Sequence, residues 1–249
     1  MWIFIGRNGG FYKFNANCPD SEKVGSGPGS CGGKKLTLEQ MLGKAKIPTK
    51  ERIVSSEFKQ QTTVENTINE AAKHGIKVSL TYDANCDEIS SVNNILNNTI
   101  WYRDNFPELN INTVASETMG NTYAKVNAHG IIRINKRHAR NIKEAKKMLK
   151  KNVLSKFHPE GCDTLQSIID HEIGHLLDNT YGIVKSKEFI QIIGGLRQSD
   201  IANGLSAYAA SDPINEIISE AWSEYKNNPS PRPISKAIGD LIMKHAKKH

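Results

Sequence analysis

The amino-acid sequence predicts an α+β fold with a small mixed or antiparallel sheet and a helical C-terminal part. Three segments in the middle of the chain, 111–117, 122–128 and 131–136, alternate apolar and polar residues and are separated by turn residues, as strands are. From residue 140 onward, apolar side chains recur at helical spacing instead. The chain has 249 residues, which is enough for one sizeable domain.

Residues 1–35 are predicted to form a hairpin and a linker that precede a main domain at 36–249. Within 2–14, alternating aromatic and aliphatic residues flank an Asn-Gly pair, which suits a tight primed turn. Residues 17–35 are rich in Gly, Ser and Pro, a composition typical of a flexible linker. The hairpin is either an appendage or a strand that this linker delivers to the main body.

The remaining elements follow from periodicity and from helix-boundary residues. Before residue 140 the sequence predicts helices at 37–45, 56–74 and 90–106, and a strand at 76–82 in addition to the three above. After it, the sequence predicts helices at 140–156, 163–182, 185–197 and 213–227, and a basic helix from about residue 235.

The segment 163–182 has the clearest helical pattern of the chain. Asp163 and Thr164 are candidate N-cap residues, and Gly182 suits a C-terminus. Its apolar residues share one face, so this face is expected to pack into the core. They are Leu165, Ile168, Ile169, Ile173, Leu176 and Leu177.

This helix carries an H-E-x-x-H motif. His171 and His175 are four residues apart, so both imidazoles project from one side and can bind one metal ion. Neutral imidazole suits zinc. Glu172 is displaced by one position, where its carboxylate can reach a water bound to the metal and take its proton. The alternative is an ordinary amphipathic helix, but such a motif arises by chance in a chain of this size with a probability on the order of one in a hundred.

A catalytic zinc normally has three protein ligands and an open position. No histidine follows at the spacing of the longer H-E-x-x-H-x-x-G-x-x-H pattern, which leaves a carboxylate. The predicted helix that begins at Asp212-Pro213 offers Glu216, Glu220 and Glu224, spaced by four on one stripe. They are either a solvated acidic stripe or buried carboxylates that need partners. The apolar residues among them favour burial, namely Ile217, Ile218, Ala221 and Trp222.

The motif "HEIGHLLD", followed by "SAYAASDPINEIISEAWSEY", resembles the gluzincin metallopeptidases, most closely the branch that contains anthrax lethal factor and the Pro-Pro endopeptidases. The matching residues span about 165–225. The resemblance implies a zincin-like domain at 36–249 with an H-E-x-x-H active-site helix and one Zn²⁺. It also implies that Glu216 is the third ligand, beside His171 and His175.

Two further roles come from the same resemblance. Glu220 is implied to hold His171 or His175 from behind, as carboxylates that orient ligand imidazoles do. Tyr208, in "SAYA", is implied to donate to the oxyanion of the reaction. Tyr208 lies eight residues before Glu216, where lethal factor has seven, and this departure concerns the tyrosine and not the zinc ligands.

Two other features lie near the expected cleft. Asp178, one turn after His175, either hydrogen-bonds a ligand histidine or is a solvated charge at the end of the helix. One of the strands at 122–128 and 131–136 is expected to lie beside the cleft, where an extended peptide can pair with it. His129, between these strands, is read as a turn residue rather than a residue that lines the cleft.

The sequence therefore predicts a zinc-dependent endopeptidase that acts on a protein or peptide substrate. One alternative is a zincin-like binding or structural module without turnover, although Glu172 and the ligands are all present. Another is a basic nucleic-acid-associated protein, because the formal net charge is +7 and basic runs occupy 136–140 and 143–151. Solvated helix faces explain these runs, and no aromatic residues are interleaved to stack on bases, so nucleic acid is not favoured.

Cysteine usage and hydropathy set the expected environment. Cys18, Cys31, Cys86 and Cys162 form no C-x-x-C pair, so reduced thiols are expected, with a Cys18–Cys31 bridge as the alternative. No run of about 18 apolar residues is present, so no membrane span is expected. The N-terminus lacks the features of a secretory signal. The expected location is cytoplasmic, or exported by a route without a recognisable signal peptide.

Overall fold

The computed structural model describes residues 3–5, 11–13 and 58–247. The strands β1 (Ile3–Ile5) and β2 (Phe11–Lys13) pair antiparallel, which confirms the hairpin predicted at 2–14. The predicted linker at 17–35 and the predicted helix at 37–45 lie outside the described residues, as do Cys18 and Cys31. Cys86 and Cys162 are free thiols, as expected.

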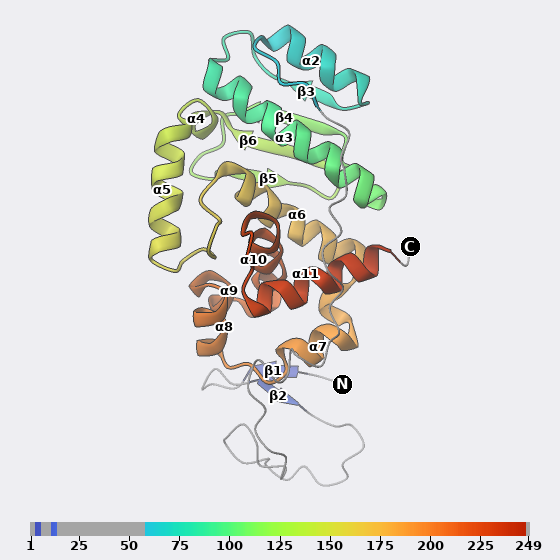
Figure 1. The fold of residues 1–249 in the computed structure, drawn as a ribbon, viewed down its shortest axis with the longest axis vertical. Coiled ribbons are helices and arrows are strands. Elements are labelled where there is room, and N and C mark those ends of the chain that lie inside the picture. The colour runs from blue at the N-terminus through green and yellow to red at the C-terminus, as the bar shows by residue number, and fades with distance from the viewer. Residues whose placement is uncertain (1–2, 6–10, 14–57, 248–249) are drawn as a thin grey trace.

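A four-stranded mixed sheet forms one end of the molecule (Figure 1). Its spatial order is β3 (Lys77–Ser79), β4 (Thr113–Glu117), β6 (Ile131–Asn135) and β5 (Ala124–Val126). The first three strands are parallel, and β5 is antiparallel to β6. The α+β class and all four predicted strands are confirmed, although β3 is shorter than the predicted 76–82.

Two helices flank this sheet on different sides. The helix α2 (Val64–Lys73) packs at the β3 edge, and α3 (Cys86–Asn105) covers one face (Figure 1). Both helices begin at a capping side chain rather than where the periodicity suggested. Thr63 accepts the N–H of Asn66, so the helix predicted from residue 56 begins at Val64. The Asn85 side chain likewise caps α3, which begins four residues before the predicted start at 90.

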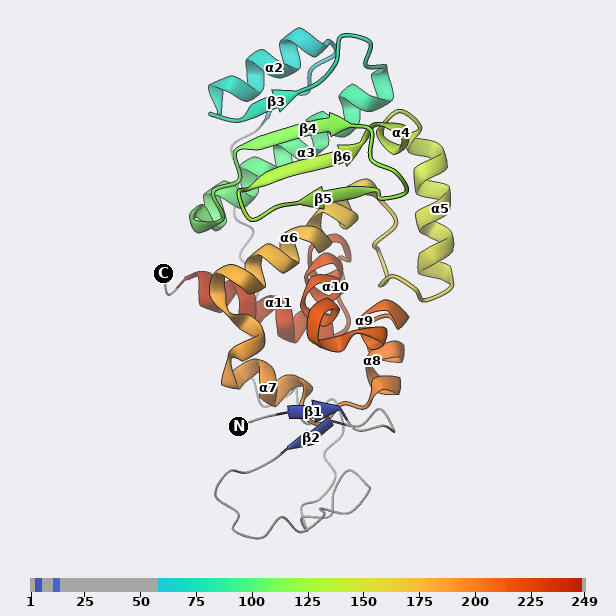
Figure 2. The ribbon, with the colours of Figure 1, turned by 180° about the vertical axis from the view of Figure 1, so that it is seen from behind.

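The predicted helix at 140–156 is present as α5 (Ile142–Leu154) and is preceded by a single turn, α4 (Lys136–Ala139). The Asn135 side chain caps α4 by accepting the N–H of Arg137, so the chain turns directly from β6 into this helix. The helix α5 lies along one side of the molecule, beyond the ends of β5 and β6 (Figure 2).

The C-terminal part is helical, as predicted. It comprises α6 (Leu165–Tyr181), α7 (Lys187–Ile193), α8 (Gln198–Gly204), α9 (Ala207–Ser211), α10 (Pro213–Asn227) and α11 (Pro233–Ala246), and the 3-10 turns of the described chain are Pro107–Leu109 and Ile183–Lys185. Thr164 caps α6 and Gly182 ends it, as predicted. Asp212 occupies the N-cap position of α10, but its carboxylate accepts from the Asn215 side chain instead of capping the helix.

The helices α6 and α10 pack closely together, and α6 also follows the open edge of β5 (Figure 2). Gly174 permits the close helix packing, because a Cβ atom there would lie 2.6 Å from the Cα of Ser219. Trp222 of α10 is fully buried and donates from Nε1 to the hydroxyl of Tyr102 on α3 at 2.7 Å. These contacts place one helix from the sheet half and two from the helical half in a common core. No helix in the described part of the chain is both long enough and apolar enough to cross a membrane.

Candidate metal centre

The helix α6 presents His171 and His175 on the face that meets α10. The capping box of Thr164 and Ser167 sets the start of the helix, and the four-residue spacing then brings both rings to one side. The ring centroids are 5.0 Å apart. His171 is buried and His175 is half-buried, so the pair is partly shielded from solvent.

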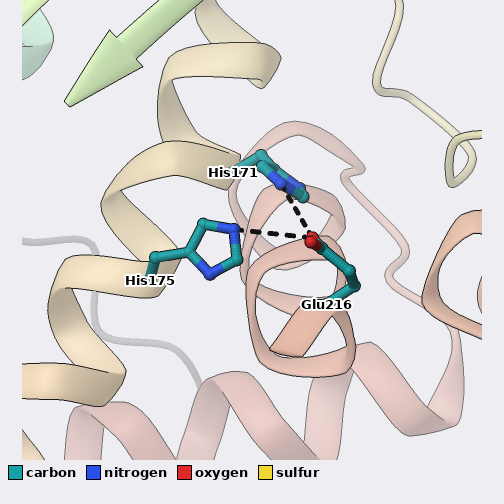
Figure 3. Close-up of side chains that lie close together, drawn as sticks. All are labelled: His171, His175 and Glu216. Atoms are coloured by element: carbon teal, nitrogen blue, oxygen red, sulfur yellow. Dashed lines mark ion pairs between the residues drawn. The ribbon is translucent and has the colours of Figure 1, made fainter. Parts of the chain in front are cut away.

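Glu216, in the first turn of α10, reaches both rings (Figure 3). Its Oε2 atom lies 3.2 Å from Nε2 of His171 and 3.4 Å from Nε2 of His175. One ligand atom from each of the three residues lies within 4.8 Å of the others. The three residues predicted to bind the metal are therefore brought together by two helices that are distant in sequence.

The two separations between Glu216 and the rings match those expected around a tetrahedral zinc ion. Two ligand atoms with bonds of about 2.0–2.1 Å and a tetrahedral angle between them are separated by about 3.4 Å. Moreover, Oε2 of Glu216 is buried, and although both ring nitrogens lie within 3.4 Å of it, neither contact has good hydrogen-bond geometry. A buried carboxylate oxygen needs a compensating partner, and a cation shared with two imidazoles is such a partner.

Glu220 lies one turn further along α10 and contacts His171 from behind. Its Oε1 atom is 2.8 Å from Nδ1 of His171, and its Oε2 accepts from the hydroxyl of Ser206 at 2.7 Å. Burial raises the pKa of Glu220, but contacts with His158 and His171 outweigh this and lower it overall. Glu220 thus contacts the ring of His171, as its predicted role requires.

His158, in the loop between α5 and α6, was missed by the sequence analysis. Its Nδ1 atom lies 3.3 Å from Oε1 of Glu220, the same oxygen that contacts His171. The ring also meets Tyr208 edge-on, with centroids 5.9 Å apart. Neither spacing nor periodicity marks a histidine in an irregular loop, so only the tertiary structure identifies it.

Tyr208, at the start of α9, stacks over His171 with ring centroids 5.9 Å apart. Burial, together with the charge and hydrogen bond of Glu216, raises the pKa of its phenol to about 12. The phenol is therefore a protonated hydrogen-bond donor beside the ligand atoms throughout the physiological range. Its position is fixed by the backbone, because the N–H of Tyr208 donates to the carbonyl of Phe157.

Glu172 points from α6 toward β5 and accepts a hydrogen bond from the backbone of Val126. Burial raises the pKa of this carboxyl, and the neighbouring charges of His171 and His175 oppose the rise. Glu172 therefore lies between the paired imidazoles and the sheet edge, and it is separate from the Glu216 and Glu220 contacts on the α10 side.

The structure separates the alternatives for two other carboxylates. Oδ1 of Asp178 accepts the backbone N–H of Val184 at 2.7 Å, so this carboxylate caps the turn after α6 and is not the partner of a ligand ring. Glu224, the third member of the acidic stripe, is fully buried and pairs with Arg232 at 2.9 Å. It is therefore a structural contact between α10 and the start of α11.

His129 is exposed in the turn before β6, as expected.

Comparisons with protein-family models, with curated proteins and with solved structures found no match for this chain. The functional interpretation is therefore built on the geometry of the candidate metal centre.

Proposed function

We propose that this chain is a zinc-dependent endopeptidase of the gluzincin type, with a zincin-like fold. The observation that supports the proposal most strongly is the convergence of His171, His175 and Glu216, with Glu172 beside the first histidine. Such a His₂Glu set leaves a position open for water or substrate, which is the arrangement of catalytic rather than structural zinc sites.

Zinc bound at this centre would polarise the scissile carbonyl and make a water molecule more acidic. The protein groups then handle the protons. Glu172 accepts a proton from the attacking water, because it is the one carboxylate beside the pair that neither ligates nor supports a ligand. The same carboxyl group then delivers that proton to the amine that leaves.

Tyr208 is proposed to stabilise the negative charge that develops on the carbonyl oxygen. Its phenol lies next to Glu216 and His171 and stays protonated, since its pKa is raised to about 12. A donor aimed at developing charge typically contributes about 10²–10³ in turnover.

The edge strand β5 provides a place for an extended peptide. Tyr123 accepts from the N–H of Asn135, and the N–H of Asn127 donates to Ile131, so these two residues of the β5 segment face β6. The intervening Ala124 and Val126 direct their backbone groups to the open edge, where Val126 meets Glu172. A substrate that pairs with this edge would lie close to Glu172 and the candidate metal ligands.

The test combines metal analysis with peptide digestion. Purified wild-type protein is expected to contain one zinc per chain and to cleave members of a peptide library, and a chelator should abolish the cleavage. Glu172→Gln should retain the zinc and lose at least about 10²–10⁴ in turnover. His175→Ala should lose the zinc as well. Absence of stoichiometric metal, or full hydrolysis by the Glu172→Gln variant, would refute the proposal.

A further inference from the structure

The helix α5 presents a row of lysines to solvent. At 100° per residue, the side chains of Lys143, Lys147 and Lys150 lie within one narrow stripe, and Lys146 and Lys151 flank it. All five are exposed, whereas Ala145 and Leu149 on the opposite side are buried. We name these five lysines the α5 lysine stripe.

The α5 lysine stripe is not neutralised by the rest of the described chain. Elsewhere in the described chain, lysines form ion pairs with carboxylates, for example Lys136 with Asp83 and Lys236 with Asp240. None of the five stripe lysines forms an ion pair with a described residue. Glu144 is the single acidic residue of α5. The helix therefore maintains a local excess of positive charge, which favours an anionic partner.

The segment that follows the α5 lysine stripe leads to the candidate metal centre. Beyond the last lysine of the stripe, Leu154 and Phe157 are 73% and 44% exposed, although both are large apolar side chains. The Phe157 ring stacks on Tyr208 with centroids 5.2 Å apart, and the next residue, His158, contacts Glu220. The backbone carbonyls of residues 156 and 157 also accept from the start of α9. One continuous surface thus runs from the lysines, across two apolar side chains, to the residues that surround the metal ligands.

We propose that this surface is an exosite that docks an acidic, extended segment of a polypeptide substrate, with an apolar side chain of that segment against Leu154 and Phe157. This inference rests on the proposed peptidase function and narrows its substrate class. The stripe is about 12 Å long, the length of three to four residues of extended peptide at about 3.4 Å per residue. A polypeptide fits better than nucleic acid, because α5 has no arginine to bind phosphates in a bidentate manner, and the aromatic ring of this surface, Phe157, is already stacked on Tyr208.

Binding is measured with the Glu172→Gln protein, so that no turnover is needed. The probes are two labelled peptides that share one apolar residue and differ only in carrying Asp and Glu or Asn and Gln beside it. The acidic peptide is expected to bind at least about tenfold more tightly at about 50 mM salt, and most of this preference should disappear at about 500 mM because exposed charges are screened.

The charge is then removed from the stripe. The triple variant Lys143→Gln, Lys147→Gln, Lys150→Gln should lose the preference for the acidic peptide. In the wild-type background the same triple variant should lower kcat/KM for the acidic peptide and leave that of the neutral peptide unchanged. The matched control removes three exposed lysines elsewhere, with Lys59→Gln, Lys77→Gln, Lys187→Gln, and should behave as wild type.

Three results would overturn the inference: equal binding of the acidic and neutral peptides, an equal loss in the control variant, or tighter binding of a duplex DNA or RNA probe than of the acidic peptide. Failure of the peptidase proposal has a different signature. It would appear as absence of zinc or of hydrolysis in the wild-type protein. The binding comparison tests the docking surface separately, because it needs no turnover.

Discussion

Glu220 lies between two imidazoles, and this contact restrains the ring of the ligand His171 from behind. The carboxylate is almost completely buried, and Ser206, His158 and His171 surround it. A restrained carboxylate raises the basicity of a ligand imidazole. It also holds the ring in place, so that less conformational entropy is lost when the ring binds a metal. His158 would therefore influence metal binding through Glu220, without touching the candidate ligand atoms.

His158→Ala is expected to weaken zinc binding by about tenfold, at the low end of the effect of removing a partner that orients a ligand. The measurement is competition with a chromophoric chelator. His158→Gln, which retains a hydrogen-bond donor for Glu220, should recover most of the affinity, and His129→Ala, in an exposed turn, should have no effect. Equal affinities for His158→Ala and wild type would show that the contact does not position the ligand.

The site residues differ in how far the sequence alone predicts them. His171, Glu172 and His175 are set by the helical repeat, which is a local property, so their common face follows from spacing. Spacing alone does not distinguish Glu216 from Glu220, because both lie on one stripe of α10 and only the packing of α10 against α6 gives them different neighbours. Their different roles were predicted from the resemblance to known peptidases. His158 has no local signal, because a loop without periodicity meets Glu220 through tertiary packing alone.

At the scale of elements, the interface of α6 and α10 depends on a residue without a side chain. Gly174 lies between the two ligand histidines in sequence, on the face that meets Ser219. The closest atom to a Cβ at this position is backbone, so rotation of a side chain cannot relieve the clash. The spacing of the two helices, and hence the distance from Glu216 to both rings, is linked to this position.

Gly174→Ala is therefore expected to lower the free energy of unfolding by about 1–3 kcal/mol, the usual cost of overpacking, despite the better helix propensity of alanine. It should also weaken zinc binding, because α10 must move away from α6. Denaturant unfolding and chelator competition measure the two effects. Gly120→Ala, where a Cβ meets no atom within 4 Å, is the control. A Gly174→Ala protein that is as stable as wild type would refute the packing argument.

The predicted elements fail in places where capping or tertiary contacts outweigh periodicity. Two helices begin at other residues than predicted, because the side chains of Thr63 and Asn85 accept hydrogen bonds from backbone N–H groups of the first turn. The short helices α8 and α9 were not predicted, since each has too few residues to show a repeat. The long helices α6 and α10 were predicted closely because their apolar faces extend over several turns.

The single turn α4 supplies a pH-dependent contribution to stability. His138 is buried and stacks on Tyr123 with ring centroids 4.2 Å apart, and burial followed by the charge of Arg137 lowers its pKa below the usual 6.5. The unfolded chain therefore binds a proton as the pH falls through about 6.5, whereas the folded protein resists binding it. The free energy of unfolding therefore suffers no penalty from His138 above about pH 6.5, and it decreases as the pH falls below that value.

The wild-type protein is expected to lose stability between about pH 7 and pH 5, and His138→Phe should lose less over the same interval. Urea unfolding at closely spaced pH values measures the difference, with the metal removed so that pH-dependent metal release does not contribute. His129→Phe, in which an exposed histidine is replaced, serves as the control. Parallel pH profiles for wild type and His138→Phe would contradict the assignment.

At the scale of the whole molecule, a buried polar network joins the same helices that carry the candidate metal ligands. Asp170, next to His171, accepts from Tyr102 and Asn98 of α3 and from Asn227 of α10. Neutral donors thus compensate a buried charge at the junction of the sheet half and the helical half. The metal would connect α6 to α10 from the open side, with Asp170 on the inner side.

Zinc is therefore expected to stabilise the whole fold and not only its own site. A ligand present at about 1,000 times its dissociation constant adds about 4 kcal/mol. For a chain of this size, that corresponds to an increase in Tm of about 8–16 °C. Calorimetry with saturating zinc and with chelator measures the shift. Glu172→Gln should show the full shift, because this residue is not a ligand, whereas Glu216→Ala should show little. If Glu216→Ala responded to zinc as strongly as wild type, the ion would be bound elsewhere, and the link between α6 and α10 would not depend on it.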